Sequence, residues 1–354
     1  ISDLGEGTDW QDEVFQDAPI RNYYLNVRGG GDKARYAIGG SYFDQQGIVG
    51  GEKAGFKRYT GNVNLDVDLT EKLKFNSVVT YAKQNRKTLS ENAIGSVLFN
   101  ALNMPSTLTP FDENGDYTLA EGLGATVINP LQQIDNTYNN VDVNRFSGTA
   151  GISYDLAEGL TFSSNLPFNF SLVTNKGFSP IEYFGAGKVF NTVESSVSES
   201  TQTYSSWGWD NVLNYEYTHD DVHKIDVTAG TSIYEENFLG VYATGWGIPN
   251  NSYEFAAVSQ ANEIRPGGAS SGEGIFRLMS QFGRIQYGYN YKYLVSAIIR
   301  RDGTTRFGPN NRFGIFPSLS LGWVMSEEGF LKGNSIIDFA KLRMSYGQTG
   351  NDKI

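Results

Sequence analysis

The sequence predicts an all-β fold, an up-and-down antiparallel transmembrane β-barrel, on three observations. Apolar and polar residues alternate with a period of two in one segment after another. The connections between these segments alternate between short turns and longer loops. Tyrosine and phenylalanine gather near the predicted strand ends, and 14% of the 354 residues are aromatic. Membrane-spanning barrels typically have short turns at one end and long loops at the other. Apolar and polar residues alternate along their strands, and aromatic residues lie at the membrane interfaces.

The alternation assigns individual strands. In residues 57–69 one face carries Tyr59, Val63 and Leu65, and the other carries Arg58 and Asn62. A helix with this period would have no apolar face, so the segments are strands. Twelve are predicted, at residues 20–29, 33–44, 56–68, 73–85, 144–156, 160–174, 204–218, 223–238, 275–290, 293–302, 313–325 and 339–348. Most are close to the ~10 residues with which a tilted strand crosses a bilayer.

The connections fall into two kinds. Short turns are predicted at residues 29–32, 69–72, 157–159, 219–222 and 291–292, and longer loops at residues 45–55, 86–143, 175–203, 239–274 and 303–312. The connection at 326–338 falls on the short-turn side but is of middling length. Outer-membrane barrels keep short turns on the periplasmic side and long loops outside. A soluble β-sandwich or propeller has no reason to sort its loops this way.

The composition excludes several classes of protein. Cysteine is absent and there are two histidines, which excludes thiolate metal sites and thiol nucleophiles and disfavours a multi-histidine metal site. The chain has 28 Lys and Arg against 39 Asp and Glu, a formal net charge of −11, and no basic block that would indicate nucleic-acid binding. No apolar run reaches the ~18 residues of a spanning helix. A nucleophile-elbow motif is absent as well. We therefore expect no cofactor and no enzymatic activity.

Two motifs have a metal-site appearance. Residues 112–116 read D-E-N-G-D, but a calcium loop would also need glycine and glutamate where Tyr117 and Leu123 stand, so we expect a β-turn. His219 and His223 have a spacing that could hold zinc on a helix. Here they straddle a predicted short turn, so a solvated turn is the expected structure.

Several motifs, in this order along the chain, identify a family. They read TDWQDEVF at 8–15, API at 18–20, GSYFDQQGIV at 40–49, RRDGTTRFGPNNRFGIFPS at 300–318 and SYGQTGN at 345–351. Together they resemble the SusC/RagA class of TonB-linked outer-membrane receptors of Bacteroidetes. We expect structural roles for the motif residues Asp9, Trp10, Arg300, Asp302, Arg306, Phe307 and Gly308. The arginines of this motif could contact a substrate or the plug. We favour a structural role, in which they shape a tight outer loop and form inner-wall salt bridges, because glycine and proline mark a turn there.

The resemblance implies more than alternation shows. Such receptors have a single 22-stranded barrel plugged by an N-terminal domain and reside in the outer membrane of Gram-negative bacteria. They contact TonB through a periplasmic segment, pair with a SusD-like surface lipoprotein that acts as a lid, and import oligosaccharides or peptides. Residues 1–19 would lead from the plug into the barrel, and residues 20–354 would form its first part, with extracellular loops at 86–143, 175–203 and 239–274. A dozen strands could not close so wide a barrel, so the plug and the TonB-contacting segment are expected outside this chain.

Aromatic residues of the long loops are the candidates for contact with a substrate or a partner. They are Phe111, Tyr138, Trp246, Tyr253 and Phe255. Exposed rings flanked by asparagine and aspartate suit stacking on a sugar or capture of a peptide. They suit equally well packing against a lid protein or folding the loop on itself. The acidic net charge slightly disfavours anionic substrates.

Three other functions remain open. A receptor-like barrel could act as a scaffold in an outer-membrane assembly without transport, which energy coupling through TonB would distinguish from an importer. An outer-membrane barrel enzyme would need a catalytic dyad at the outer rim, and no sequence motif indicates one. A soluble β-sandwich is disfavoured by the alternation of short turns and long loops and by the family resemblance.

Overall fold

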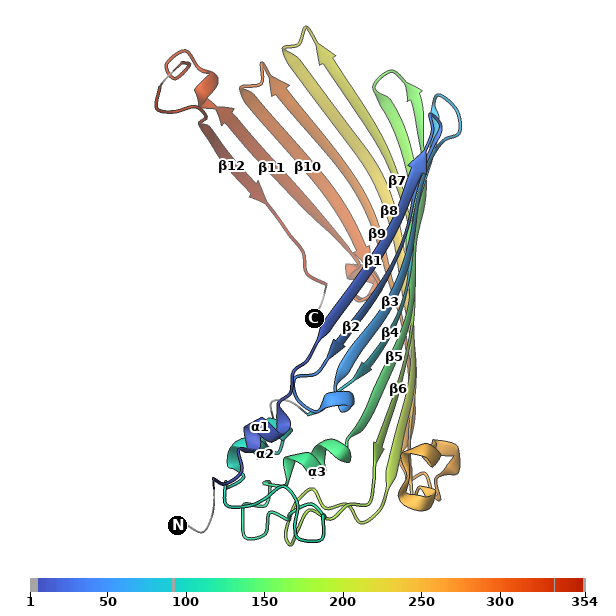
Figure 1. Cartoon of the computed structure of the whole chain (residues 1–354). Coiled ribbons are helices and arrows are strands. Elements are labelled where there is room, and N and C mark those ends of the chain that lie inside the picture. The colour runs from blue at the N-terminus through green and yellow to red at the C-terminus, as the bar shows by residue number, and fades with distance from the viewer. Residues whose placement is uncertain (1–5, 91–92, 334, 353–354) are drawn as a thin grey trace.

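The structure, a computed structural model, describes residues 6–90, 93–333 and 335–352. It contains one antiparallel sheet of twelve strands in sequential order, each paired with its neighbours in the chain. The strands are β1 (Ile20–Gly30), β2 (Ala34–Gln46), β3 (Gly55–Asp68), β4 (Leu73–Lys87), β5 (Tyr138–Ala157), β6 (Leu160–Ser179), β7 (Ser196–His219), β8 (His223–Trp246), β9 (Ala269–Tyr289), β10 (Tyr293–Thr304), β11 (Phe313–Val324) and β12 (Lys341–Gly347). Figure 1 shows that the sheet is open and strongly curved, with β1 and β12 at its edges.

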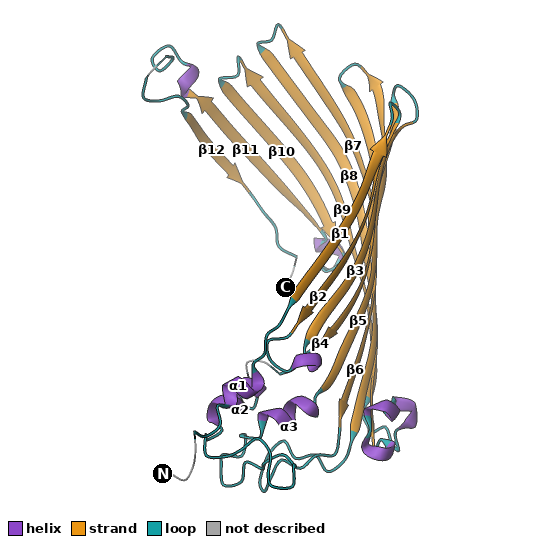
Figure 2. Ribbon diagram, viewed as in Figure 1, coloured by secondary structure: helices purple, strands orange, loops and turns teal. Residues whose placement is uncertain are grey.

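The helices are short and lie in the connections. The α-helices are α1 (Trp10–Val14), α2 (Val97–Asn103) and α3 (Pro130–Asp135), and the 3₁₀ turns are η1 (Gly51–Lys53), η2 (Pro249–Asn251), η3 (Tyr253–Phe255), η4 (Val258–Gln260), η5 (Pro309–Asn311) and η6 (Met325–Glu327). Figure 2 shows α1, α2 and α3 gathered beyond one end of the sheet, among the long loops. Within the described ranges, no helix has the length and apolar character needed to cross a membrane.

All twelve predicted strands are confirmed, but several predicted loop boundaries are wrong. Strands β5 to β9 have 20 to 24 residues, so the predicted loops at 86–143, 175–203 and 239–274 are too wide. The extra residues lie at the long-loop end of the sheet, where residues 196–203 are mostly serine and threonine. Because hydrophilic residues occupy both faces there, apolar and polar residues no longer alternate along the sequence. The backbone hydrogen bonds between strands nevertheless continue.

The connections alternate in length as predicted. On the short-turn edge, β7 and β8 are joined through Asp220 and Asp221, whose φ angles are 52° and 56°. Consecutive positive φ angles are typical of tight hairpins whose twist matches that of the flanking strands. The same arrangement recurs between β9 and β10, at Asn290 and Tyr291. The connection at 325–340, which contains η6, lies on this edge and is the longest one there.

The strand register gives the sheet one apolar face and one polar face. Val27, Ile38, Val63 and Val79 pair directly across β1 to β4 and form one apolar row. The first three are 45 to 56% exposed, so this face has no protein core beneath it. Exposed apolar rows of this extent require an apolar environment. The neighbouring row has the opposite character, since it pairs Asn62, Thr80 and Ser147.

Candidate functional site: the polar wall and the loop cap

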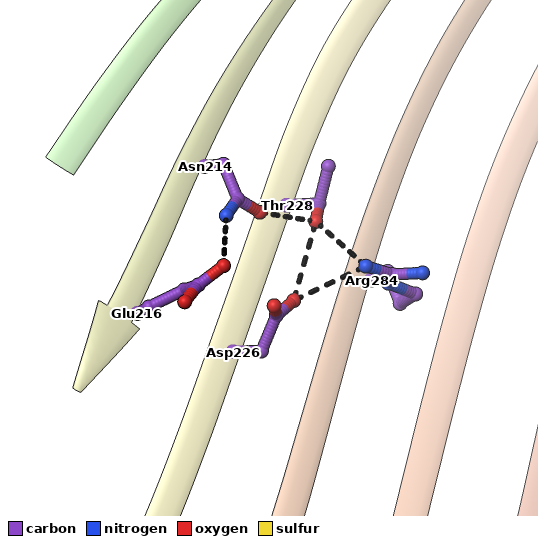
Figure 3. Close-up of polar contacts among 5 residues, drawn as sticks. All are labelled: Asn214, Glu216, Asp226, Thr228 and Arg284. Atoms are coloured by element: carbon purple, nitrogen blue, oxygen red, sulfur yellow. Dashed lines mark hydrogen bonds and ion pairs between the residues drawn. The ribbon is translucent and has the colours of Figure 1, made fainter. Parts of the chain in front are cut away.

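The polar face of the sheet, here called the polar wall, carries hydrogen-bonded charges that join neighbouring strands (Figure 3). A guanidinium nitrogen of Arg284 on β9 lies 3.2 Å from Asp226 Oδ1 and 3.2 Å from Thr228 Oγ1, both on β8. Thr228 in turn donates to Asn214 Oδ1 on β7 at 2.8 Å, and Asn214 donates to Glu216 at 3.2 Å. Five side chains therefore link three strands, and Arg284 is neutralised by an acidic neighbour.

A second ion pair lies on the polar wall nearer the long-loop end. Arg300 Nε donates to both oxygens of Asp302, at 2.7 and 2.8 Å, and its Nη2 donates to the buried Ser280 hydroxyl at 3.0 Å. Both residues belong to the long motif at 300–318 and were expected to be structural. The Arg300 side chain joins β10 to β9 through Ser280 and pairs with the Asp302 carboxylate on its own strand. This arrangement favours a structural role.

The rest of this motif shapes the loop between β10 and β11. Arg306 Nε lies 3.6 Å from Asp352 Oδ2, and its guanidinium carbon lies 4.6 Å from the centre of the Phe276 ring. The carbonyl of Phe307 accepts a hydrogen bond from Arg312 Nε at 3.4 Å. Gly308 precedes η5 and acts as its N-cap residue. These contacts lie within the loop, between the loop and Phe276 on β9, and between the loop and the segment that follows β12.

A folded unit, the loop cap, covers the long-loop edge near β1 to β6. We define it as residues 6–19, 88–90, 93–137 and 180–195. Its core contains buried Trp10, Val97 and Met104, which bring α1 and α2 together. Trp10 Nε1 also donates to the carbonyl of Pro105 at 2.9 Å. Asp9 begins α1 by accepting hydrogen bonds from the backbone N–H groups of Gln11 and Asp12. Residues 6–19 thus pack on the long-loop edge; their origin in a plug stays a prediction.

Two buried asparagines complete the loop cap. Asn100 on α2 donates to Gln133 Oε1 at 2.7 Å and accepts from the backbone N–H of Ile128 at 3.2 Å. Asn129 caps α3 and donates to the carbonyls of Pro110 and Thr118 at 2.9 and 3.1 Å. Neither residue was predicted from the sequence, because buried amides in a long loop follow no regular spacing. The one available signal was Asn129 directly before Pro130, a common helix start.

Two of the five predicted contact residues lie together and hold a loop. The rings of Tyr138 and Tyr253 stack with their centres 4.9 Å apart, and Phe178 lies 5.6 Å from Tyr138. Lys53 Nζ sits 3.6 Å from the centre of the Tyr138 ring and donates to the carbonyl of Asp135 at 2.8 Å. Burial lowers the pKa of Lys53. This cluster attaches residues 247–268 to the ends of β5 and β6.

The other three predicted residues lie apart from this cluster. Trp246 packs beneath the Arg265 guanidinium, which lies 4.8 Å from the ring centre and pairs with Glu263 and Glu194. Phe255 is 47% exposed, and Phe111 is 46% exposed, with its ring 5.1 Å from that of Tyr117. Tyr138 and Trp246 were expected in loops and instead are end residues of β5 and β8. Their role in binding a substrate or a partner stays a prediction.

The two metal-like motifs form turns. Asp112 Oδ1 accepts from the backbone N–H groups of Asn114 and Asp116 at 2.8 and 2.9 Å, so the predicted β-turn is confirmed. His219 and His223 end β7 and begin β8, on either side of the tight turn, as expected. In the part of the chain that the structure describes, no group of three or more histidine and acidic side chains could hold a metal ion.

Comparison with known proteins decides the family. The chain is 33% identical to TonB-dependent receptor P39 of Formosa agariphila over 98% of its length, and 26% identical to TonB-dependent receptor SusC of Bacteroides thetaiotaomicron over 100%. It superimposes on a structure of the RagAB peptide transporter with a TM-score of 0.84, at 24% identity, over 99% of the chain. The chain belongs to the SusC/RagA class of TonB-dependent receptors. No protein-family model matches it.

Family membership fixes the location and the surroundings of the sheet. The twelve strands form part of a receptor barrel in the outer membrane, so the apolar face contacts lipid and the polar wall faces the barrel interior. The relatives are receptors and transporters, in agreement with the expectation that this protein is not an enzyme. The chain spans 32% of the P39 receptor, 36% of SusC and 39% of the RagAB structure's matching chain.

Proposed function

We propose that this receptor imports oligosaccharides or peptides across the outer membrane, with a SusD-like surface lipoprotein as its lid and TonB as its source of energy. The observation that carries the proposal is the match to TonB-dependent receptors over 98% of the chain or more. One structural neighbour is a peptide transporter by name, and one sequence relative is SusC.

The two faces of the sheet support a transporting barrel. The polar wall carries amides, hydroxyls and paired charges. These groups can form hydrogen bonds with water and with hydrophilic solutes inside the barrel. The loop cap and the aromatic cluster around Tyr138 give the long-loop edge a defined shape. A shaped outer rim is where a ligand would first be recognised and where a lid protein would pack.

Uptake by intact cells tests the proposal. We expect deletion of this receptor and deletion of TonB to abolish uptake of the same ligand from a panel of neutral glycans, acidic glycans and peptides. A strain with an unrelated receptor deleted is the control. We also expect a SusD-like lipoprotein to copurify with the full-length receptor. If neither deletion changes any uptake while a surface complex falls apart without this barrel, the receptor is a scaffold and the import proposal is wrong.

A further inference from the structure

The polar wall is hollowed near the long-loop end of β4 to β7. The cavity there has a volume of about 540 Å³. Its lining includes Gln84, Arg86, Arg145, Asn169, Ser206 and Glu236. Arg86 is the residue before the last one of β4, so this end of the cavity lies two residues from the start of the loop-cap segment at residue 88. A ligand that enters past the long loops would meet this part of the wall early.

The strand register shows that the cavity belongs to the interior face. Arg86 pairs with Val141, and Arg145 lies four residues further along β5, on the same face as Val141. Four residues of strand span about 13 Å. Asn169 on β6 pairs with Ser147, two residues along β5 from Arg145, and also with Ser206 on β7, so both polar groups lie on this face. Two guanidinium groups therefore approach one hollow from positions well separated along the wall.

These two arginines lack the carboxylate partners that Arg284 and Arg300 have on the same wall. Arg284 pairs with Asp226, and Arg300 pairs with Asp302. Arg86 and Arg145 are exposed and form no ion pair with any acidic residue in the described part of the chain.

The local charge of the cavity is positive. Of the described residues that line it, only Glu236 is acidic, and it already accepts a hydrogen bond from the Tyr234 hydroxyl at 2.8 Å. Arg58, which pairs with Gln84 in the register, adds a third cation beside the cavity. The net charge of −11 for the whole chain disfavours anionic substrates, but a ligand in this cavity meets only the side chains that line it.

We propose that this cavity binds anionic groups, carboxylate or sulfate, of the ligand that the receptor imports. The inference rests on the proposed import function. A guanidinium group matches the geometry of a carboxylate or sulfate with two parallel hydrogen bonds, which lysine cannot do. The surrounding amides and hydroxyls suit the uncharged polar groups of a sugar or a peptide backbone. Two arginines about 13 Å apart favour an extended ligand that carries more than one anionic group.

Binding to the full-length receptor in detergent tests the inference. The probes are a short oligouronide, a sulfated oligosaccharide, an acidic hexapeptide and a neutral oligosaccharide of similar length. We expect at least one anionic probe to bind. Arg86→Gln and Arg145→Gln should each weaken that binding by about tenfold, because each removes a charge-assisted pair. High salt should weaken it as well. The matched control is Arg35→Gln, which removes an exposed arginine from the same wall at its short-turn end.

The outcomes separate this inference from the import proposal. The double variant carries both Arg86→Gln and Arg145→Gln. The cavity is not an anion site if no anionic probe binds the parent receptor, or if the double variant binds the anionic probe as tightly as the parent does. The same conclusion follows if the double variant weakens binding of the neutral oligosaccharide as much as binding of the anionic probe. TonB-dependent uptake of a neutral ligand that persists in the double variant would then leave the import proposal intact. If uptake proves independent of TonB, the import proposal fails whatever the arginine variants do. The probe that binds identifies the source of the anionic group.

Discussion

Glu328 joins three side chains at the short-turn edge, just beyond β11. Its Oε1 accepts from the Tyr293 hydroxyl at 2.6 Å and from Trp323 Nε1 at 3.2 Å, and its Oε2 lies 3.6 Å from Lys292 Nζ. The hydrogen bonds from Tyr293 and Trp323, with the charge of Lys292, lower the pKa of Glu328 below its ordinary value of 4.5. One carboxylate thus connects the β9–β10 turn to the connection at 325–340.

The lowered pKa predicts an acid-sensitive connection. A depressed carboxylate pKa adds stability that is present above the ordinary value of 4.5 and is lost as the pH falls through the folded-state value. We expect hydrogen exchange in residues 325–333, corrected for intrinsic rates, to be slow at pH 6 and to accelerate below pH 4.5. Glu328→Gln should remove this dependence, whereas Glu327→Gln, a neighbour with 50% of its side chain exposed, should keep it. An unchanged pH profile in Glu328→Gln would refute the assignment.

At the scale of elements, the stacked Tyr138 and Tyr253 rings connect the start of β5 to η3. The rings lie in a cluster with buried Phe178 and Val197, so replacing either ring removes apolar contacts as well as stacking. Aromatic pairs contribute about 0.5–1.5 kcal/mol beyond the burial of their area. The contact is therefore expected to limit opening of residues 247–268.

A double-mutant cycle measures this contact. We expect Tyr138→Leu and Tyr253→Leu each to increase hydrogen exchange in residues 247–268, with a coupling free energy of about 1 kcal/mol between them. Phe255→Leu is the control, because this ring is 47% exposed on the same 3₁₀ turn. Additive effects of the two tyrosine changes would show that the rings stabilise the loop independently. Ligand uptake by the same variants would show whether either ring also contacts substrate.

The elements were predictable to different degrees for a physical reason. Within the membrane, one face of each strand meets lipid and the other meets the barrel interior. Apolar and polar residues therefore alternate along the strand, as Val63 and Asn62 do on β3, and this alternation made the strands predictable. Beyond the membrane both faces meet water, and the ends of β5 to β9 lose that signal. Residue type pointed to Tyr138 and Tyr253, but not to their contact with each other. The cavity at Arg86 and Arg145 was missed, because the pairing of a charge depends on the register of several strands.

At the scale of the whole molecule, the assignment of the two faces can be tested by a single charge on each. Val63 and Asn62 are adjacent on β3, and their side chains point to opposite faces. If the apolar face contacts lipid, Val63→Arg should destabilise the folded receptor by about 2–4 kcal/mol when the position is near the bilayer centre. Asn62→Arg should cost much less, because the interior is polar. Denaturation of the full-length receptor in lipid vesicles measures both changes. A larger loss for Asn62→Arg would reverse the faces, and with them the assignment of the arginine cavity to the interior.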